Sequence, residues 1–478
     1  MGIAALACFV AVATAQDAPP AASPAAAAPA LAAPASLRHV VIVTIDTVRA
    51  DRLGCYGYFR DTSPRLDAVA AESLRFTRCL TPIAQTTPSH WSLFTGVGPF
   101  EHNVLSNHAG AMTRGKSVER GRDTVATLRT VAERFAEAGV KTGGFVGATP
   151  VKRSTGLAAG FAAWSEPVDE GRRLGKAVID DALAFLGTVG DARAFLWVHL
   201  FDAHEPLRPP FTPPAYLERF RGDARLDAWL AERRFAAALP ELTQRNLTIA
   251  GSNDRYDGAL RFLDDQLAPL LDRLDEPAWR DSTALVIVAD HGTALGQHDH
   301  FGHGIVWDEQ LRVPLLLRVP GVAPRVVDTP CSTLDLWPML FGLAPELTVA
   351  GVLEQCRGSD VLHSEGAARP IVSTAARSGS DAITAGRWKL VRMKGAPSQL
   401  YDLQDDPHEL TDVAHDHSDV VDRLSKLLEA EIARQKRAAA LHQRSGAETG
   451  APDPKLLEEL RALGYTEDDS SGGGGGGD

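Results

Sequence analysis

The chain is poor in cysteine, in positive charge and in long apolar segments. It has 5 cysteines in 478 residues, and their spacing does not match a cysteine metal site. Lysine and arginine (49) are outnumbered by aspartate and glutamate (61), and the net charge of −12 argues against a nucleic-acid-binding surface. Beyond the N-terminus no apolar run is long enough for an integral membrane segment, and no repeat has a fixed period. What remains is an ordinary globular composition, in a chain long enough for one large and one smaller domain.

The two ends of the chain predict processing and disorder. Residues 1–15 are an apolar stretch that ends in Ala13-Thr14-Ala15, a pattern typical of a cleaved signal peptide, so we expect a periplasmic or secreted protein. Residues 16–37 are almost all alanine and proline, which predicts a stiff, extended linker. At the other end, residues 467–478 are rich in glycine, serine and aspartate and are expected to be a disordered tail.

Four cysteines remain after removal of the signal peptide. Export permits a disulfide, and Cys331 and Cys356 are near enough in sequence to pair. Cys55 and Cys79 lie in apolar contexts and are expected to be inert core thiols.

Alternating apolar strands and amphipathic helices predict an α/β fold. Residues 38–365 are expected to form a catalytic domain with a mostly parallel sheet covered by helices on both faces. Residues 366–466 are expected to form a smaller antiparallel α+β subdomain. The expected strands are 39–45, 142–147, 194–200, 283–289, 313–319, 387–393 and 399–403, and the expected helices are 64–73, 124–139, 176–186, 254–274 and 418–438. Ser63 and Asp123 are the expected caps of the first two helices.

Four polar side chains stand where this fold would bring them together. Asp46 and the pair Asp290-His291 each end a buried-strand pattern, and ligands of open α/β sheets bind beyond the carboxyl ends of the strands. Thr86 precedes a helix that Pro88 could start, and a helix N-terminus can lower the pKa of a hydroxyl. Two carboxylates, an imidazole and a hydroxyl suit a divalent metal. The simpler interpretations are that the aspartates cap turns, that Thr86 caps the helix, or that Thr87 is the reacting residue.

Several separated motifs give the chain a resemblance to the sulfatase family of the alkaline-phosphatase superfamily. In chain order they are VVIVTIDTVRADRLGCYG (40–57), TTPSHWSLFTG (86–96), FLWVHLFDAHEP (195–206), YDGALRFLDDQL (256–267), VADHGTALGQHDHFGHGIVWDEQLRVPLLLR (288–318), GRWKLVRM, QLYDLQDDPHEL and LRALGY. The resemblance extends from about residue 38 to about residue 466, and motifs in this order are far more specific than one short pattern. It implies a protein of the α/β fold class that hydrolyses ester bonds.

The chain departs from the family pattern at the residues that carry the chemistry. Thr86 stands where sulfatases have the cysteine that becomes formylglycine, and His90 stands at the arginine of that motif. The early Asp-Asp pair is Asp46-Thr47, the late Asp-Asn pair is Asp290-His291, and His303 stands at the lysine position that follows. Because threonine cannot become the aldehyde, the aldehyde-hydrate mechanism of sulfate cleavage is closed to this chain.

The resemblance, with these departures, implies a phosphoryl-transfer centre in a sulfatase frame. Asp46, Thr86, Asp290 and His291 are the expected ligands of one divalent metal, with Zn²⁺ or Mn²⁺ favoured over Ca²⁺. Thr86 is then the nucleophile, as the metal-bound threonine is in the superfamily's phosphatases and phosphodiesterases.

Three histidines are the expected substrate contacts, namely His90, His204 and His303. His204 matches a family histidine that contacts the transferred group, and His204 and His303 are also expected to move protons. A second metal held by His204, Asp202 or His303 is the less favoured alternative.

The predicted function is that of an exported, metal-dependent hydrolase that cleaves phosphate or sulfate esters, with phosphoryl transfer through Thr86 favoured. The expected partner is a small anionic ester. Three alternatives stay open: a true sulfuric-ester hydrolase, a phospholipid-head-group transferase, and an inactive ester-binding protein. Tyr256-Asp257 and Asp264-Asp265 are interpreted as a structural, solvated helix face, and residues 387–394 as a basic strand surface.

Overall fold

A computed structural model of the chain describes residues 37–107, 128–168, 171–204, 212–233, 242, 247–364, 369–375, 378–442 and 458–459. Residues 1–36 and 460–478 are outside these ranges, so the signal peptide, most of the linker and the disordered tail stay predictions. Among the described residues, no helix combines the length and the apolar character needed to cross a lipid bilayer.

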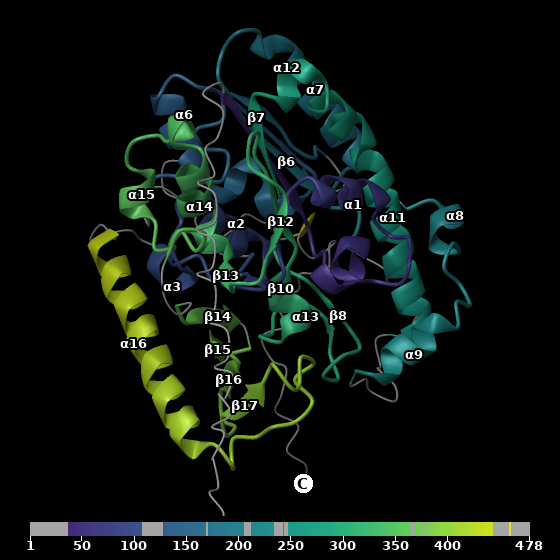
Figure 1. The fold of residues 1–478 in the computed structure, drawn as a ribbon, viewed down its shortest axis with the longest axis vertical. Helices are drawn as coiled ribbons and strands as arrows, with labels where there is room; N and C mark the ends of the chain where they lie inside the picture. The colour runs from purple at the N-terminus through teal and green to yellow at the C-terminus, as the bar shows by residue number, and fades with distance from the viewer. Residues whose placement is uncertain are drawn as a thin grey trace, which may run out of the picture. The chain divides into compact units, whose positions relative to one another are not determined.

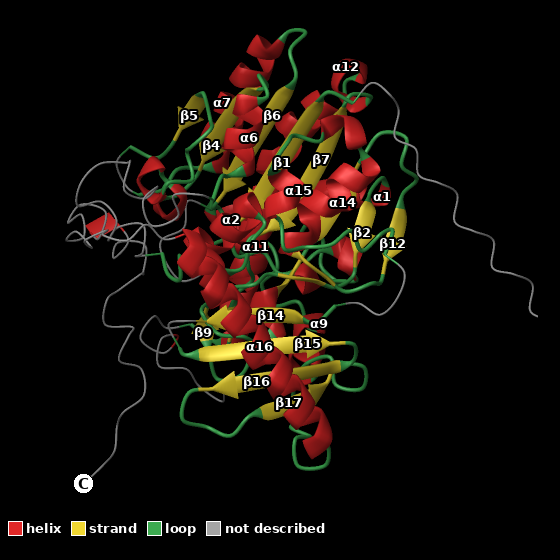
Figure 2. Cartoon of the chain, turned by 90° about the vertical axis from the view of Figure 1, so that its left-hand side faces the viewer, coloured by secondary structure: helices red, strands yellow, loops and turns green. Residues whose placement is uncertain are grey.

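The centre of the fold is an eight-stranded, mostly parallel sheet (Figures 1 and 2). Its strands, in spatial order, are β12 (Arg325–Val327), β2 (Leu74–Phe76), β11 (Leu315–Arg318), β7 (Thr283–Ala289), β1 (His39–Ile45), β6 (Ala194–Leu200), β4 (Lys141–Val146) and β5 (Ala163–Ser165). Only β11 runs against its neighbours β7 and β2. Every residue of β1, β6 and β7 is buried, which explains their near-continuous apolar sequences.

Helices cover both faces of this sheet, as the alternating pattern predicts (Figure 2). On one face lie α2 (Thr86–Thr95), α6 (Val131–Glu137), α14 (Leu336–Leu343) and α15 (Val352–Gln355), and on the other lie α7 (Gly175–Val189) and α11 (Ile249–Leu274). The remaining α-helices are α1 (Pro64–Ala71), α3 (Pro99–His102), α8 (Pro214–Leu217), α9 (Arg225–Ala231), α12 (Pro277–Arg280) and α13 (Asp308–Leu311). Short strands form a hairpin, β8 (Ala294–Leu295) with β9 (Phe301–Gly302), and a small sheet of β10 (Arg312–Val313), β3 (Cys79–Leu80) and β13 (Cys331–Ser332).

The C-terminal part is a four-stranded antiparallel sheet with one long helix, as expected (Figure 2). Its elements are β14 (Ile371–Ala375), β15 (Ser380–Ala385), β16 (Trp388–Met393), β17 (Gln399–Asp402) and α16 (Ser418–His442). Apolar residues of α16 pack on Ile383, Leu390 and Leu400 of the sheet. Lys389 departs from the expected basic strand surface, because its ammonium is fully buried between Asp308 (2.6 Å) and Glu409 (2.5 Å).

Several local predictions were wrong in detail. The expected strand 313–319 is split between β10 and β11, because Pro314 lacks the N–H that a continuous ladder needs. The helix expected to start at residue 124 begins at Val131, where Thr130 forms a capping box with Glu133. Its expected cap, Asp123, lies outside the described residues.

Ser63 is the N-cap residue of α1, as expected, but its side chain makes no capping hydrogen bond, because its hydroxyl donates to Asp67 instead. The disulfide between Cys331 and Cys356 is absent, and both thiols are free. Cys331 instead lies in register with Cys79 on the neighbouring parallel strand.

Candidate metal and nucleophile site

The register of the three central strands places the two candidate aspartates side by side. Ile45, the last residue of β1, is in register with Ala289 of β7 and with Leu200 of β6. Asp46 and Asp290 are the next residues of their chain segments, and the Asp46 N–H donates to the Leu200 carbonyl (2.9 Å). They therefore meet at the carboxyl ends of parallel strands, where the sequence pattern predicts a ligand site.

Both carboxylates are buried, and each keeps one oxygen without a hydrogen-bond partner among the described residues. These oxygens are Oδ1 of Asp46 and Oδ2 of Asp290. Burial by itself would raise the pKa of Asp46, but the neighbouring imidazoles of His204, His199 and His291 outweigh it and hold that pKa below its usual value. Burial, followed by the charge of Asp46, raises the pKa of Asp290 well above its usual value. Only one of two such close carboxylates is readily ionised without a cation between them.

A strained turn follows β1 at Thr47, the position at which the resemblance implies the second aspartate of an Asp-Asp pair. Thr47 has φ of +56°, a rare conformation for a β-branched residue. Its hydroxyl donates to the Asp46 carbonyl (2.8 Å), and its N–H donates to Oδ1 of Asp290 (3.2 Å). The Tyr256 hydroxyl, on α11, donates to the Thr47 carbonyl (2.8 Å) and accepts the Arg49 N–H (3.1 Å). Thr47 thus orients Asp290 through its backbone and does not offer a ligand from its side chain.

His291 is oriented so that one nitrogen faces the nucleophile candidate. Its Nδ1 donates to the Gly292 carbonyl (2.9 Å), which leaves Nε2 as the nitrogen with a lone pair. That Nε2 lies 3.3 Å from Oγ1 of Thr86 and 3.5 Å from Oδ2 of Asp290. Burial is the main reason that the pKa of His291 is lowered to about 4, so the neutral imidazole is the form present near neutral pH.

Helix α2 starts at Thr86 and not at Pro88, with Gln85 as its N-cap. Thr86 therefore lies in the first helical turn, fully buried, with its hydroxyl at His291. The hydroxyl of Thr87 instead donates to the Pro150 carbonyl (2.6 Å), and the Thr87 N–H donates to Asn107 (2.8 Å). Of the two threonines, Thr86 is the one whose hydroxyl faces His291.

His90 supports Thr86 from inside the protein. Its Nδ1 bonds to the Thr86 carbonyl (2.8 Å), and its Nε2 bonds to the Thr44 hydroxyl (3.1 Å). Burial, and then the nearby His199, lowers the pKa of His90 to about 3. With both ring nitrogens occupied, His90 differs from the substrate contact expected from the sequence.

The other two histidines, His204 and His303, lie at the more exposed edge of this cluster of side chains. His204 is 9% exposed, its ring stacks on Phe201 (4.2 Å between centroids), and its Nε2 lies 3.9 Å from Oδ1 of Asp46. His303 is partly exposed, and its ring lies 4.4 Å from that of His291 and 5.5 Å from that of His204. Its Nδ1 bonds to the Ala84 carbonyl (3.1 Å). The structure thus brings the predicted histidines 204, 291 and 303 together.

Sequence reasoning missed His199, which lies within strand β6. The Gly147 N–H donates to its Nδ1 (3.4 Å), so its Nε2 carries the proton and lies 3.3 Å from Oδ2 of Asp46. The available signal was a lone imidazole in an otherwise apolar, fully buried strand. His199 therefore occupies one oxygen of Asp46 and leaves the other for a ligand.

The donor set fits a divalent cation. Asp46, Asp290 and His291 offer ligand atoms that all lie within 4.8 Å of one another, and the described residues contain no second group of this kind. The two orphaned carboxylate oxygens and the lone pair of His291 Nε2, which faces the Thr86 hydroxyl, are the acceptors that a cation would use. Asp202, considered for a second metal, accepts the N–H of Gly175 at the start of α7 (3.0 Å).

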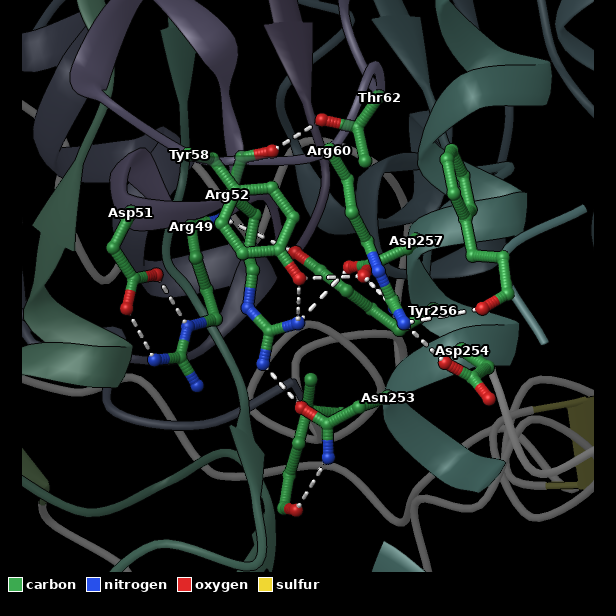
Figure 3. A network of polar contacts seen from close by, with 12 residues as sticks. Arg49, Asp51, Arg52, Tyr58, Arg60, Thr62, Asn253, Asp254, Tyr256 and Asp257 are labelled. Carbon is green, nitrogen blue, oxygen red and sulfur yellow. Dashed lines mark hydrogen bonds and ion pairs between the residues drawn. The ribbon is translucent and has the colours of Figure 1, made fainter. Parts of the chain in front are cut away.

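Asp257 (Figure 3) and Asp264 of α11 are buried and not solvated, contrary to the helix-face interpretation, whereas Asp265 is partly exposed. Asp257 accepts from Arg52 (3.0 Å), Arg60 (2.6 Å) and Tyr58 (2.6 Å). Asp264 accepts the N–H groups of the first turn of α1. Their role is structural, as expected, although their environment is not.

Comparisons with known proteins identify the family and the fold. The Sulfatase family model matches residues 38–346. An uncharacterized sulfatase of Escherichia coli, YidJ, is 26% identical over 430 residues, which is 79% of this chain and 83% of that protein. Among solved structures, the yidJ protein of Bacteroides fragilis has a TM-score of 0.70 at 18% identity and covers 86% of this chain and 98% of its own. The phosphonate monoester hydrolase of Agrobacterium radiobacter has a TM-score of 0.61 at 19% identity, with coverage of 85% and 96%.

The match covers most of the chain and includes the strands and loops that carry Asp46, Thr86 and Asp290. This chain belongs to the sulfatase family and is a hydrolase that acts on ester bonds.

Proposed function

We propose that this chain is a metal-dependent hydrolase that cleaves phosphate esters by transferring the phosphoryl group through Thr86. The observation that supports it most is the position of the Thr86 hydroxyl, 3.3 Å from His291 Nε2, beside two buried carboxylates. Thr86 also stands where sulfatases have the cysteine that becomes formylglycine. A threonine there is a direct nucleophile and not the precursor of an aldehyde.

The proposed metal ligands are Asp46, Thr86, Asp290 and His291. An imidazole and a hydroxyl beside two carboxylates favour Zn²⁺ or Mn²⁺, with Ca²⁺ as the alternative. When bound, a divalent ion would lower the pKa of the Thr86 hydroxyl and offset the charge that develops in the transition state.

The first chemical step forms a bond from the Thr86 oxygen to phosphorus and breaks the bond from phosphorus to the alcohol oxygen. The Thr86 proton leaves to solvent, and the alcohol oxygen receives a proton from His204, which lies at the more exposed edge of the cluster. In the second step water attacks phosphorus and the bond to Thr86 breaks, and the Thr86 oxygen takes back a proton from solvent. His303 accepts the water proton, because burial lowers its pKa and favours the neutral imidazole. Both histidines also contact the non-bridging oxygens of the ester.

The test is a substrate panel on metal-free protein before and after addition of Zn²⁺, Mn²⁺ or Ca²⁺. The panel contains 4-nitrophenyl phosphate, bis(4-nitrophenyl) phosphate and 4-nitrophenyl sulfate, and Thr86→Ala protein from the same preparation is the control. We expect turnover of a phosphorus ester that needs Zn²⁺ or Mn²⁺ and is lost in the control. Faster turnover of the sulfate would overturn the preference for phosphorus, and no turnover with any metal would support an inactive ester-binding protein.

Sulfate-ester hydrolysis is the second candidate, and family membership favours it. The Escherichia coli relative is described as a sulfatase, and sulfate and phosphate esters have a similar tetrahedral shape. Trapping a radiolabelled phosphate on Thr86 with a phosphorus ester would separate the two candidates. A head-group transferase ranks lower, because among the described residues no helix could hold the protein in a bilayer.

Export belongs to the same proposal. It rests on the apolar residues 1–15 and their alanine-rich cleavage pattern alone. Mass spectrometry of the protein expressed from its full gene should find mature chains that begin at Gln16, and an intact Met1 would contradict it.

A further inference from the structure

The loop that carries His303 is flexible by sequence, and something else must hold it. His303 lies between Gly302 (φ +94°) and Gly304 (φ +113°), both in conformations that favour glycine. The contact of its Nδ1 with the Ala84 carbonyl fixes the ring but not the backbone that follows. The position of this imidazole therefore depends on what binds residues 304 and 305.

Gln310, on the short helix α13, makes those contacts. It is fully buried, and its side-chain Oε1 accepts the N–H of Gly304 (2.7 Å) and the N–H of Ile305 (2.9 Å). Its Nε2 has no hydrogen-bond partner among the described residues, so the side chain serves only as an acceptor here. One buried oxygen thus satisfies the two amide groups that directly follow His303.

The backbone of the same residue holds the other histidine. The Gln310 carbonyl accepts the N–H of Gly292 (2.8 Å), the residue after His291. The approach is close, because a Cβ built on Gly292 would lie 2.2 Å from the Glu309 carbonyl oxygen. Gln310 therefore contacts the backbone next to both histidines, through its side chain at His303 and through its main chain at His291.

We infer that Gln310 is a positioning residue that holds the His303 imidazole at the candidate site through its side-chain oxygen. The inference rests on the proposed function for the role of His303, but the side-chain contact can be tested without it. Because a substitution at residue 310 removes only the side-chain oxygen, it should disturb His303 and leave the main-chain link to His291 intact.

The variant is Gln310→Met, which keeps the length and removes the acceptor. Its matched control is Gln435→Met on α16, since Gln435 is also buried and also accepts a backbone N–H, that of Phe100 (3.2 Å). The first readout is NMR of protein with ¹⁵N-labelled histidine, with the His303 ring signal assigned from the spectrum of His303→Ala. We expect Gln310→Met to shift or broaden that signal and Gln435→Met to leave it unchanged. An unchanged His303 signal in Gln310→Met overturns the inference, whether or not the protein has ester activity.

The second readout is a double-mutant cycle on kcat for the best ester of the panel, at saturating metal. Gln310→Met should lower kcat about 10–100-fold, as the loss of a supporting contact does. It should cause no further loss in a His303→Ala background, and the metal Kd should stay within about threefold of wild type. The inference is overturned if Gln310→Met lowers kcat by the same factor in the His303→Ala background as in wild type. It is also overturned if the metal Kd weakens as much as kcat falls. If His303→Ala alone keeps wild-type kcat, the proposed function has failed and the NMR result still decides the contact.

Gln310→Glu covers the case in which the methionine variant does not fold. Glutamate keeps acceptor oxygens for the two amide groups, so kcat should stay within about threefold of wild type. A fall in kcat of more than about tenfold in the glutamate variant would contradict the inference that an acceptor oxygen at residue 310 positions His303.

Discussion

Two buried polar clusters, one at the ends of β1 and β7 and one on α11, treat their carboxylates in opposite ways. In the arginine cluster of Arg52, Arg60 and Asp257 (Figure 3), both carboxylate oxygens of Asp257 form ion pairs, and the two buried arginines neutralise its charge. At the candidate site the ion-pair partners of Asp46 and Asp290 are all imidazoles, and each carboxylate keeps an oxygen with no hydrogen-bond partner among the described residues. A carboxylate matched by arginine is complete within the fold, whereas two unmatched carboxylates need a cation from outside.

Tyr256 connects the two clusters. Its neighbour Asp257 belongs to the arginine cluster, while its own hydroxyl holds the strained Thr47 turn that orients Asp290. The cluster whose carboxylate is matched by arginine thus supplies the rigid base on which the unmatched one is built. The comparison leads to separate predictions for activity, stability, metal response and pH.

The largest expected effect is on catalysis at the unmatched cluster. Thr86→Ala removes the proposed nucleophile, so kcat should fall by about 10⁴-fold, equivalent to about 5 kcal/mol of barrier. Thr87→Val is the matched control: its hydroxyl serves a backbone carbonyl, so about 1 kcal/mol of stability should be lost with little change in kcat. Steady-state kinetics on both variants checks this. Equal kcat in Thr86→Ala and wild type would remove Thr86 from the mechanism.

The next effect is on folding at the matched cluster. Asp257→Asn leaves the buried Arg52 without its carboxylate and removes one of the carboxylates that pair with Arg60, so the free energy of unfolding should fall by about 3–5 kcal/mol. Asp265→Asn, on the same helix but partly exposed, should cost no more than about 1 kcal/mol. Urea unfolding of both variants measures the difference. Similar losses in the two variants would mean that the arginine cluster is not the rigid base described above.

At the unmatched cluster, replacing a carboxylate should not lower the free energy of unfolding when no metal is bound. Asp290→Asn removes repulsion from Asp46, so the metal-free variant should be at least as stable as metal-free wild type. Metal at 100 times its Kd should stabilise wild type by about 2.7 kcal/mol and should not stabilise the variant. Thermal unfolding with and without Zn²⁺ or Mn²⁺ tests both statements. An equal metal-induced rise in Tm for the two proteins would contradict the ligand assignment.

The last expected effect concerns pH. Asp264 is buried and accepts two backbone N–H groups, and burial raises its pKa to about 7, whereas an unfolded aspartate titrates near pH 3.9. A raised folded pKa means that its contribution to stability is complete below about pH 4 and is lost as the pH rises to about 7. The free-energy difference between wild type and Asp264→Asn should therefore change by up to about 4 kcal/mol across that range, because each pKa unit of the shift corresponds to about 1.4 kcal/mol. Urea unfolding at several pH values measures it, and a difference independent of pH would contradict the raised pKa.

Much of the fold and the centre of the site could be predicted from sequence. The strands that end at Asp46 and Asp290 are continuous apolar runs, so their ends, and hence the meeting of the two carboxylates, follow from the pattern. The placement of Thr86 beside them came from the family resemblance, because no local periodicity relates residue 86 to residue 290.

Other features depend on contacts between distant segments, which a single sequence does not contain. Asp257 and Asp264 look like a solvated helix face because charged residues usually are, and only the arginines of another segment bury Asp257. His199 was missed since a histidine inside an apolar strand is usually part of the core. The break at Pro314 could have been predicted from its missing N–H.

The central claim is that Asp46, Asp290 and His291 gather a cation that the protein itself does not supply. The most direct measurement is anomalous diffraction from crystals of the protein grown with Zn²⁺ or Mn²⁺. We expect one strong anomalous peak bounded by these three side chains, and its loss in crystals of Asp290→Asn. A peak held by other residues, or none between these three at saturating metal, would contradict this assignment of the metal ligands.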